Sequence, residues 1–301
     1  MNIFRAALDN NLACRLFVLN MKLSVWSSFL KELSPEEAVK VFKSKGLDTM
    51  ELSREHAKAL FLRENHSLTA RDFKNFLADE EFTLCQGHLP MLDFVDGSRP
   101  REHLDELKRQ VEFYISLGVP NIVLHVGKGL VPPPPIPYED LLEKRASGVR
   151  ELSKICEGTG TYLCLENLVA NMRTSSEIKD VIYAVGSPAV AVCYDSGHLN
   201  QTRLEGHAEF INNLAPYIRA THINDNEGSY EQHFLPFSLG LDLPKGRVHK
   251  VGFAEVVKTL KGIGYDGAFN FEVPGENVAP LPILLAKLDY IVAVGKYLIS
   301  I

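Results

Sequence analysis

The chain lacks the cysteine patterns of disulfide-stapled and zinc-ribbon proteins. Its 301 residues include five cysteines, an odd number without any C-x-x-C pair, so neither a disulfide framework nor a structural zinc ribbon is indicated. Cys85, Cys164 and Cys193 stand inside short apolar runs, where a reduced, buried thiol is the ordinary interpretation. This cysteine usage predicts a reducing, cytoplasmic location.

Three further features are missing. No apolar run approaches the ~18 residues of a membrane-spanning helix, and no Gly-rich phosphate fingerprint follows any strand-like run. No Gly/Ser-rich linker or block of like charges divides the chain. The net charge of −6 argues against nucleic acid as a partner. We therefore expect a single soluble domain that associates with neither membranes nor nucleic acid.

The first 20 residues differ from the rest. Arg5 and the apolar residues after it resemble a signal peptide faintly, but Arg15 interrupts the apolar part and no small-residue cleavage site follows. A clean strand pattern opens only at Met21. We expect residues 1–20 to be an N-terminal extension outside the fold and residues 21–301 to form the domain.

From Met21 onward, short apolar runs alternate with longer amphipathic ones. Strands are predicted at residues 22–26, 48–52, 82–86, 121–125, 161–165, 190–194, 218–223 and 267–273. Helices are predicted at residues 35–45, 70–80, 101–117, 138–157, 174–185, 206–217, 251–263 and 280–297. Eight strand-then-helix units predict an α/β fold, the (β/α)8 TIM barrel. An open, doubly wound sheet is the alternative.

Chemistry-bearing residues stand where the predicted strands end. The run V-A-V-C-Y-D-S-G-H-L-N at residues 190–200 leaves the strand pattern at Asp195, and Gly197 allows a sharp turn that presents His198. The same layout recurs along the chain, and the carboxyl ends of barrel strands converge on one face. The predicted strand ends contribute His88, His125, Glu166, Asp195, His198, His222 and Glu272, and the loop at residues 224–249 adds Glu231 and His233.

Carboxylates and imidazoles gathered in this way favour a metal site. Desolvated carboxylates repel one another unless a cation or a partner compensates them. Ligands from His and carboxylates without Cys suit Mn²⁺, Zn²⁺, Co²⁺ or Mg²⁺. Simpler interpretations hold for single residues: a cap or salt bridge for Glu51, packing for Trp26, a core histidine for His125. Histidines on helical or loop stretches are taken as solvated: His56, His66 and His103.

Six motifs together resemble the xylose isomerase-like TIM-barrel superfamily, over residues 21–301. They are L-H-V-G (His125), L-C-L-E-N (Glu166), C-Y-D-S-G-H (Asp195, His198), T-H-I-N-D-N (His222), E-Q-H-F-L-P (His233) and F-N-F-E-V (Glu272). This superfamily includes sugar phosphate isomerases and epimerases, inosose and dehydroshikimate dehydratases, and endonuclease IV. The ordered set of motifs is specific to the superfamily and does not choose a member.

The epimerase branch would make the chain a metal-dependent isomerase or epimerase of a sugar, sugar phosphate or related polyol. The resemblance implies one divalent metal held by Glu166, Asp195, His222 and Glu272. Glu166 and Glu272 would transfer a proton as base and acid, through a metal-stabilised enediolate. His198 would bond a substrate oxygen, and Trp26 and Asn167 would contact the sugar.

Two other enzyme classes and a binding protein remain open. An endonuclease IV-like phosphodiesterase would use three metals, with Glu166 bridging a first held by His88 and His125 to a second held by Asp195, His222 and Glu272. His198, Glu231 and His233 would hold the third, although Glu231 stands where that family has Asp. A dehydratase, which is a lyase, would use nearly the epimerase residues. A binding protein without catalysis would not need the intact carboxylate set. We favour the isomerase/epimerase, with a small carbohydrate as substrate and a homo-oligomer left open.

Overall fold

Eight parallel strands form a closed barrel in the computed structural model, which describes residues 21–127, 136–238, 250–275 and 279–301. The expected extension at residues 1–20 and the end of the long loop, residues 239–249, lie outside these ranges. The strands are β1 (Lys22–Val25), β2 (Thr49–Leu52), β3 (Thr83–His88), β4 (Asn121–Leu124), β5 (Tyr162–Glu166), β6 (Val190–Asp195), β7 (Ile218–His222) and β8 (Ala268–Phe271). The predicted barrel is confirmed.

The ring closes in two places by single bridges. Ladders join β2 through β7 in sequence order, and β1 pairs with β8. Bridges between Trp26 and Glu51 and between Ile223 and Phe271 connect these two groups of strands. No strand of the ring is therefore left as an open edge.

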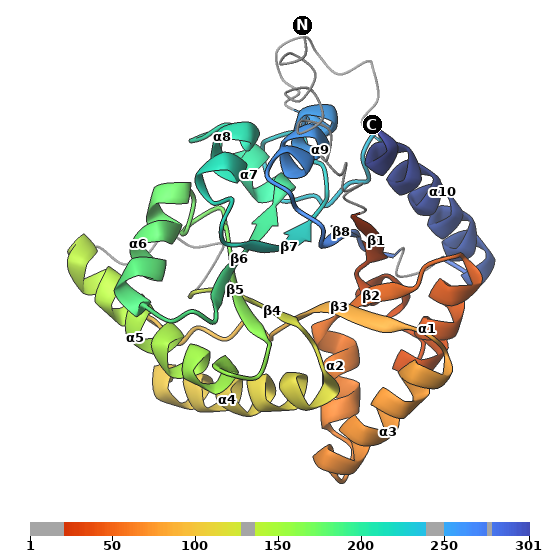
Figure 1. Cartoon of the computed structure of the whole chain (residues 1–301), viewed down its shortest axis with the longest axis horizontal. Coiled ribbons are helices and arrows are strands. Elements are labelled where there is room, and N and C mark those ends of the chain that lie inside the picture. Colours follow the sequence, from red (N-terminus) through yellow and green to blue (C-terminus); the bar gives the residue numbers. More distant parts are fainter. Residues whose placement is uncertain (1–20, 128–135, 239–249, 276–278) are drawn as a thin grey trace, which may run out of the picture.

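Helices surround the barrel (Figure 1). Between strands β1 and β4 lie a 3-10 helix, η1 (Ser27–Leu30), and the helices α1 (Pro35–Ser44), α2 (Arg54–Phe61), α3 (His66–Asp79) and α4 (Pro100–Leu117). The remaining helices are α5 (Tyr138–Cys156), α6 (Ser175–Val185), α7 (Ser196–Thr202), α8 (His207–Asn213), α9 (Phe253–Gly262) and α10 (Leu281–Ser300). The sequence patterns missed α2 and α7, the latter because Gly197 was interpreted as a turn residue.

Local sequence explains where the main helices begin and end. Ser34 caps α1 through a reciprocal capping box with Glu37, and Pro35 occupies the first turn. Helix α4 ends at Gly118, whose φ of +80° is the left-handed conformation that glycine adopts without strain. Such caps fix the helix limits independently of the barrel.

Small side chains fill the inside of the barrel and determine which residues reach the site. One buried cluster inside the barrel consists of Val123, Cys164, Ala191, Cys193 and Ala220. Because side chains alternate along a strand, the residue two positions after an inward-facing one also faces inward. For Val123, Cys164, Cys193 and Ala220 these next residues are His125, Glu166, Asp195 and His222.

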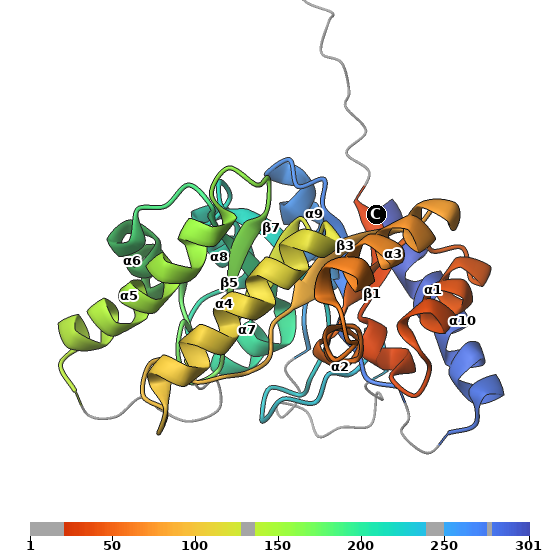
Figure 2. The same ribbon diagram turned by 90° about the horizontal axis from the view of Figure 1, so that it is seen from below.

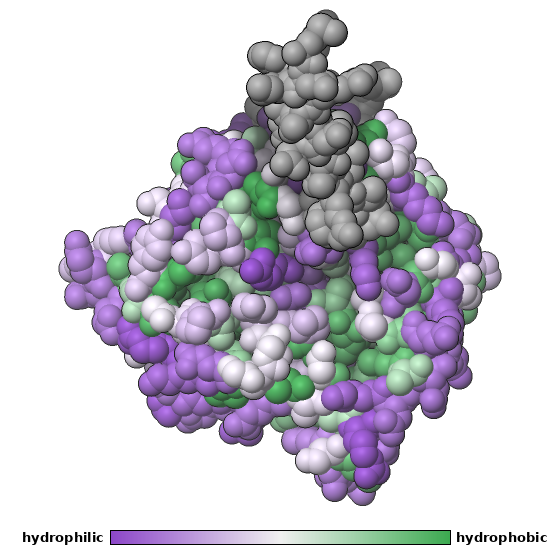
Figure 3. All heavy atoms as spheres, in the orientation of Figure 1, coloured by the Kyte–Doolittle hydropathy of each residue, from purple (hydrophilic) through white to green (hydrophobic). Residues whose placement is uncertain are grey.

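The two ends of the barrel differ. In Figure 2 the described chain begins at the upper end of β1, so the strand carboxyl ends point downwards, where the segment that follows β7 extends. Figure 3 views the opposite end and shows hydrophilic side chains around most of its rim. No helix in the described part of the chain combines the length and apolar character needed to cross a membrane.

Candidate metal and active site

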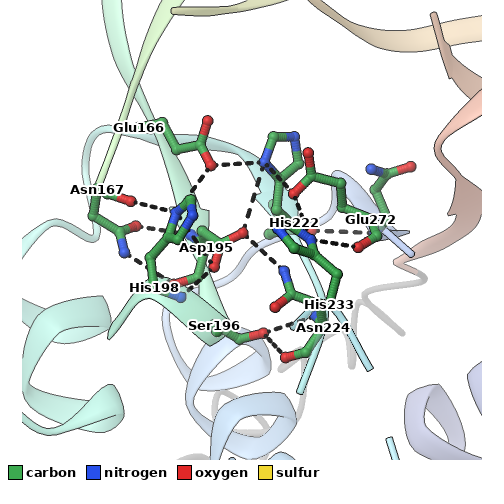
Figure 4. Close-up of polar contacts among 12 residues, drawn as sticks. Glu166, Asn167, Asp195, Ser196, His198, His222, Asn224, His233 and Glu272 are labelled. Atoms are coloured by element: carbon green, nitrogen blue, oxygen red, sulfur yellow. Dashed lines mark hydrogen bonds and ion pairs between the residues drawn. The ribbon is translucent and has the colours of Figure 1, made fainter. Parts of the chain in front are cut away.

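Four residues from four strand ends converge on one point (Figure 4). His222 Nδ1 lies 3.0 Å from Glu166 Oε1, 3.3 Å from Glu272 Oε2 and 3.9 Å from Asp195 Oδ2. One ligand atom from each of Glu166, Asp195, His222 and Glu272 lies within 4.8 Å of the others. The structure thus brings together all four residues of the expected ligand set.

The chemistry of this group fits a divalent cation. Glu166 Oε2 and Glu272 Oε2 are buried and have no hydrogen-bond partner. His125 Nε2 lies 2.8 Å from Glu166 Oε2, and His222 Nδ1 lies 3.3 Å from Glu272 Oε2. Neither pair of atoms has the geometry of a hydrogen bond. A buried carboxylate with an oxygen that lacks a partner is costly, and a cation would compensate the charge of both carboxylates.

A further carboxylate, which the sequence interpretation set aside, orients His222. Glu51 is fully buried, and its Oε1 lies 3.1 Å from His222 Nε2. Asn270 donates a hydrogen bond from Nδ2 to the other oxygen of Glu51. An imidazole that donates from Nε2 to a carboxylate keeps its Nδ1 lone pair for a metal. Glu51 is indeed an ion-pair partner, but its partner is His222 in the candidate site. The sequence feature that could have revealed this role is a charged residue inside the apolar run M-E-L.

Asp195 is held by two asparagines. Asn167 accepts from the Asp195 backbone N–H at 2.7 Å and donates to its carbonyl at 2.9 Å. Asn224 donates from Nδ2 to Asp195 Oδ2 at 2.9 Å. Both ends of the Asn167 amide are therefore engaged with Asp195, and its expected contact with substrate stays a prediction.

Gly197 has a different role from the expected sharp turn. It lies inside the helix α7, which begins directly after Asp195. A Cβ atom at this position would lie 1.9 Å from Asn224 Oδ1. Glycine is needed because the side chain of Asn224, which bonds Asp195, occupies the space that a Cβ atom would fill.

His198 faces the same group of carboxylates. Its Nδ1 lies 2.9 Å from the Asn167 carbonyl and 3.3 Å from Glu166 Oε1. Its Nε2 lies 3.3 Å from Glu231 Oε1. The His198 side chain is only 5% exposed, so its contacts with these carboxylates are buried inside the protein.

The segment after β7 brings Glu231 and His233 to the site. Reciprocal backbone hydrogen bonds between Asp225 and Phe234, of 2.7 and 2.8 Å, close this segment into a loop. Glu231 Oε1 lies 2.7 Å from His233 Nε2, and His233 Nδ1 lies 3.0 Å from the Glu272 carbonyl. His233 has a φ of +49°, a conformation that costs a non-glycine residue energy and is concentrated at functional sites.

His88 and His125 stand on the far side of Glu166. The Nε2 atoms of His88 and His125 lie 3.5 and 2.8 Å from Glu166 Oε2. His88 donates from Nδ1 to the Leu89 carbonyl at 2.7 Å, which leaves its Nε2 directed at the site. Liganding atoms of His88, Glu166 and His222 lie within 4.8 Å of one another, as do those of His198, Glu231 and His233.

The remaining candidates lie in different surroundings. Trp26 follows β1 beside Glu51 and is partly buried, and its Nε1 is buried with no hydrogen-bond partner. The solvated interpretation of His56 is wrong, because this side chain is 2% exposed and bonds the Leu33 carbonyl at 3.0 Å. His66 is exposed and stacks on Phe61, and His103 bonds the Asp93 carbonyl.

The two candidate acid/base carboxylates have pKa values displaced in opposite directions. Burial raises the pKa of Glu166, but His222, His125 and His198 more than compensate and hold it well below its ordinary value. Burial, together with the charges of Glu166 and Asp195, raises the pKa of Glu272 to about 7 against the opposing effect of His222. Paired groups separated in this way are suited to opposite roles in proton transfer.

Comparisons with known proteins agree with this architecture. The sequence model of the family described as xylose isomerase-like TIM barrel matches residues 39–293. A curated relative, an uncharacterised protein of Sinorhizobium fredii, is 29% identical over 171 residues, or 56% of this chain and 51% of the relative. The match therefore spans about half of that relative's length.

Solved structures resemble nearly the whole chain. A D-tagatose 3-epimerase-like protein is 20% identical, with a TM-score of 0.69 over 93% of this chain and 98% of its own. A D-psicose 3-epimerase of Clostridium cellulolyticum, solved with D-tagatose, is 16% identical, with a TM-score of 0.72 over 93% of this chain and 99% of its own. At these identities the likeness establishes the fold.

Proposed function

The chain belongs to the xylose isomerase-like TIM-barrel family, and we propose that it is a metal-dependent isomerase or epimerase of a sugar, sugar phosphate or related polyol. The observation that carries this proposal is the pair of buried glutamates on β5 and directly after β8. Each has one oxygen without a hydrogen-bond partner, and both lie beside Asp195 and His222. The similarity in fold to proteins named as 3-epimerases supports the same class of reaction.

A divalent metal would be held by Glu166, Asp195, His222 and Glu272. When bound, it would supply positive charge beside a substrate carbonyl and its neighbouring hydroxyl, which makes loss of the intervening C–H proton easier.

The two glutamates would move the proton. Glu166, whose pKa is held low, would be ionised at neutral pH and take the proton at Oε2. Glu272, whose pKa is raised to about 7, would return a proton at the opposite side from the carboxylate oxygen that does not face His222. Abstraction from one face and return to the other inverts a carbon centre, as an epimerase requires.

Five other residues would position this machinery and the substrate. Glu51 fixes the orientation of His222, and Asn167 and Asn224 fix Asp195. His198 would donate a hydrogen bond to a substrate oxygen after exchanging its contact with Glu231. Trp26 would stack on the sugar ring.

The test is proton exchange. The protein would be incubated in D₂O with Mn²⁺ and, separately, with D-tagatose, D-psicose, D-fructose and an inosose. We expect deuterium at a carbon next to the carbonyl of one of them, read by NMR, together with an epimer or isomer. Loss of water from the product would identify a dehydratase instead, and no exchange with any substrate would contradict the proposal.

A second candidate is the three-metal phosphodiesterase. It is favoured by the two additional groups, His88–Glu166–His222 and His198–Glu231–His233, whose ligand atoms also lie within 4.8 Å. Elemental analysis of protein purified without chelator or nickel separates the candidates. About one metal per chain supports the epimerase, whereas three zinc ions per chain with cleavage of abasic DNA would support the phosphodiesterase.

A further inference from the structure

Helix α10 is apolar on two faces. Its inner face packs on the barrel through buried residues such as Leu288, Ile291 and Leu298. Its outer face carries Ile283, Tyr290 and Tyr297, which are 55%, 47% and 57% exposed. Figures 1 and 2 both place α10 at the periphery of the molecule. A helix that is apolar all round is ordinarily covered on both sides.

The outer face has the spacing of a helix that pairs with another helix. Its exposed residues, which we call the outer stripe, follow steps of three and four: Ile283, Ala286, Tyr290, Ala293, Tyr297 and Ser300. This is the heptad pattern in which side chains of one helix insert between those of a second. Phe237, 55% exposed, extends the stripe by contacting the Tyr297 ring at 6.2 Å between centroids.

Along the stripe, large and small residues alternate strictly. When two such helices run antiparallel, Tyr290 of one meets Ala293 of the other, and Tyr297 meets Ala286. Each ring then faces a methyl group, which is the arrangement that fills space without clashes. A parallel pairing would place tyrosine against tyrosine instead.

Two charged residues beside the stripe, Asp289 and Lys296, also complement their own copies when the two helices run antiparallel. Asp289 and Lys296 are both exposed and one heptad apart on this flank of the stripe. In an antiparallel pair, Asp289 of one helix lies opposite Lys296 of the other, twice by symmetry. Asp289 Oδ2 also lies 2.8 Å from Lys45 Nζ within the chain, and its side chain remains 61% exposed, so it has room for the second contact.

We propose that the outer stripe of α10 binds a second copy of this chain, with the two helices antiparallel about a two-fold axis. The alternation of size and the Asp289–Lys296 flank both select this occupant, because each feature complements its own reversed copy. The flank carries one acidic and one basic residue rather than the basic cluster of a helix that lies on a membrane.

Sedimentation velocity of the full chain over a range of concentrations tests the proposal. We expect twice the mass of one chain, and Ala293→Glu, which brings a charge against the partner's tyrosine, should give single chains. Tyr290→Ser should weaken association as well. The matched control is Tyr183→Ser on α6, where the tyrosine is 65% exposed and lies away from the stripe; it should leave the dimer intact. Circular dichroism checks that each variant is folded.

Charge reversal tests the orientation. Asp289→Lys and Lys296→Asp should each weaken association by on the order of tenfold, and the double exchange should restore it. Single chains at every concentration would overturn the proposal, as would a dimer indifferent to Ala293→Glu. A double exchange that fails to restore association would overturn the antiparallel arrangement.

Discussion

At the scale of single residues, Glu166 and Glu272 are identical side chains in different surroundings. Three imidazoles face Glu166 and keep it ionised, whereas Glu272 shares its surroundings with two other carboxylates. The difference comes from which strand ends stand next to each glutamate. The barrel therefore separates the pKa values of the two glutamates, which suits them to the opposite roles that we propose.

Replacing either glutamate by glutamine would remove one of the two proposed proton-transfer groups with little change of shape. We expect Glu166→Gln and Glu272→Gln each to lower kcat by at least about 100-fold, with the unfolding temperature kept or raised. The control is Glu143→Gln, because Glu143 is 70% exposed on α5. Full activity in either site variant would refute the two-carboxylate mechanism.

Glu51 should act through His222 rather than on the substrate. Glu51→Gln keeps the volume but removes the charge opposite His222 Nε2. Loss of such an outer partner weakens metal binding by about 10- to 100-fold. A competition titration with a chromogenic chelator measures the affinity directly, and unchanged affinity would contradict this positioning role.

His207 gives the folded chain a specific sensitivity to acid. Burial lowers its pKa to about 4, and the Tyr194 hydroxyl bonds its Nδ1 at 2.7 Å. Between pH 6.5 and 4 the unfolded chain therefore binds a proton that the folded chain does not, so stability falls as pH falls. Above pH 6.5 His207 is neutral in both the folded and the unfolded chain, so it no longer makes stability depend on pH.

His207→Asn, which retains an acceptor for Tyr194, should flatten this dependence. Urea unfolding between pH 4 and 7, with chelator present, should show a slope up to about 1.4 kcal/mol per pH unit smaller than in the wild type. Parallel curves for the two proteins would show that His207 titrates alike in the folded and unfolded chains.

At the scale of elements, α7 and the segment after β7 fit together through Gly197. A methyl group there would displace Asn224, which bonds Asp195. We expect Gly197→Ala to destabilise the protein by about 1–3 kcal/mol and to weaken metal binding. Gly262→Ala on α9 is the matched control, since its methyl group meets nothing within 4 Å and alanine favours a helix. Equal stability of the two variants would contradict the close approach.

At the scale of the whole molecule, the barrel gathers Glu166, Asp195 and Glu272 at one end of a closed ring of strands. A cation that binds only the folded chain stabilises it, by about 2.7 kcal/mol at a concentration 100 times the dissociation constant. Chelator should therefore lower the unfolding temperature by several degrees, and added Mn²⁺ or Zn²⁺ should restore it. An unfolding temperature indifferent to chelator and metal would argue against the site.

Much of the site could be predicted because it follows strand ends. Glu166, Asp195, His222 and Glu272 each stand at or next to the end of a predicted strand, and alternation within a strand decides which way they point. Glu51 was missed because a lone glutamate at a strand end is usually a surface partner. Its role depends on His222 and Asn270, which are 171 and 219 residues away.

The sequence by itself determined the order of the strands, most of the helices and the barrel, because these depend on local periodicity. The family resemblance of its motifs pointed to the four residues expected to hold a metal. Only the tertiary structure decided that Glu51 supports His222, that Gly197 makes room for Asn224 and that Glu166 and Glu272 titrate differently. Those properties depend on distances between segments remote in sequence and on the exclusion of water. Burial and neighbouring charge exist only once the barrel has closed.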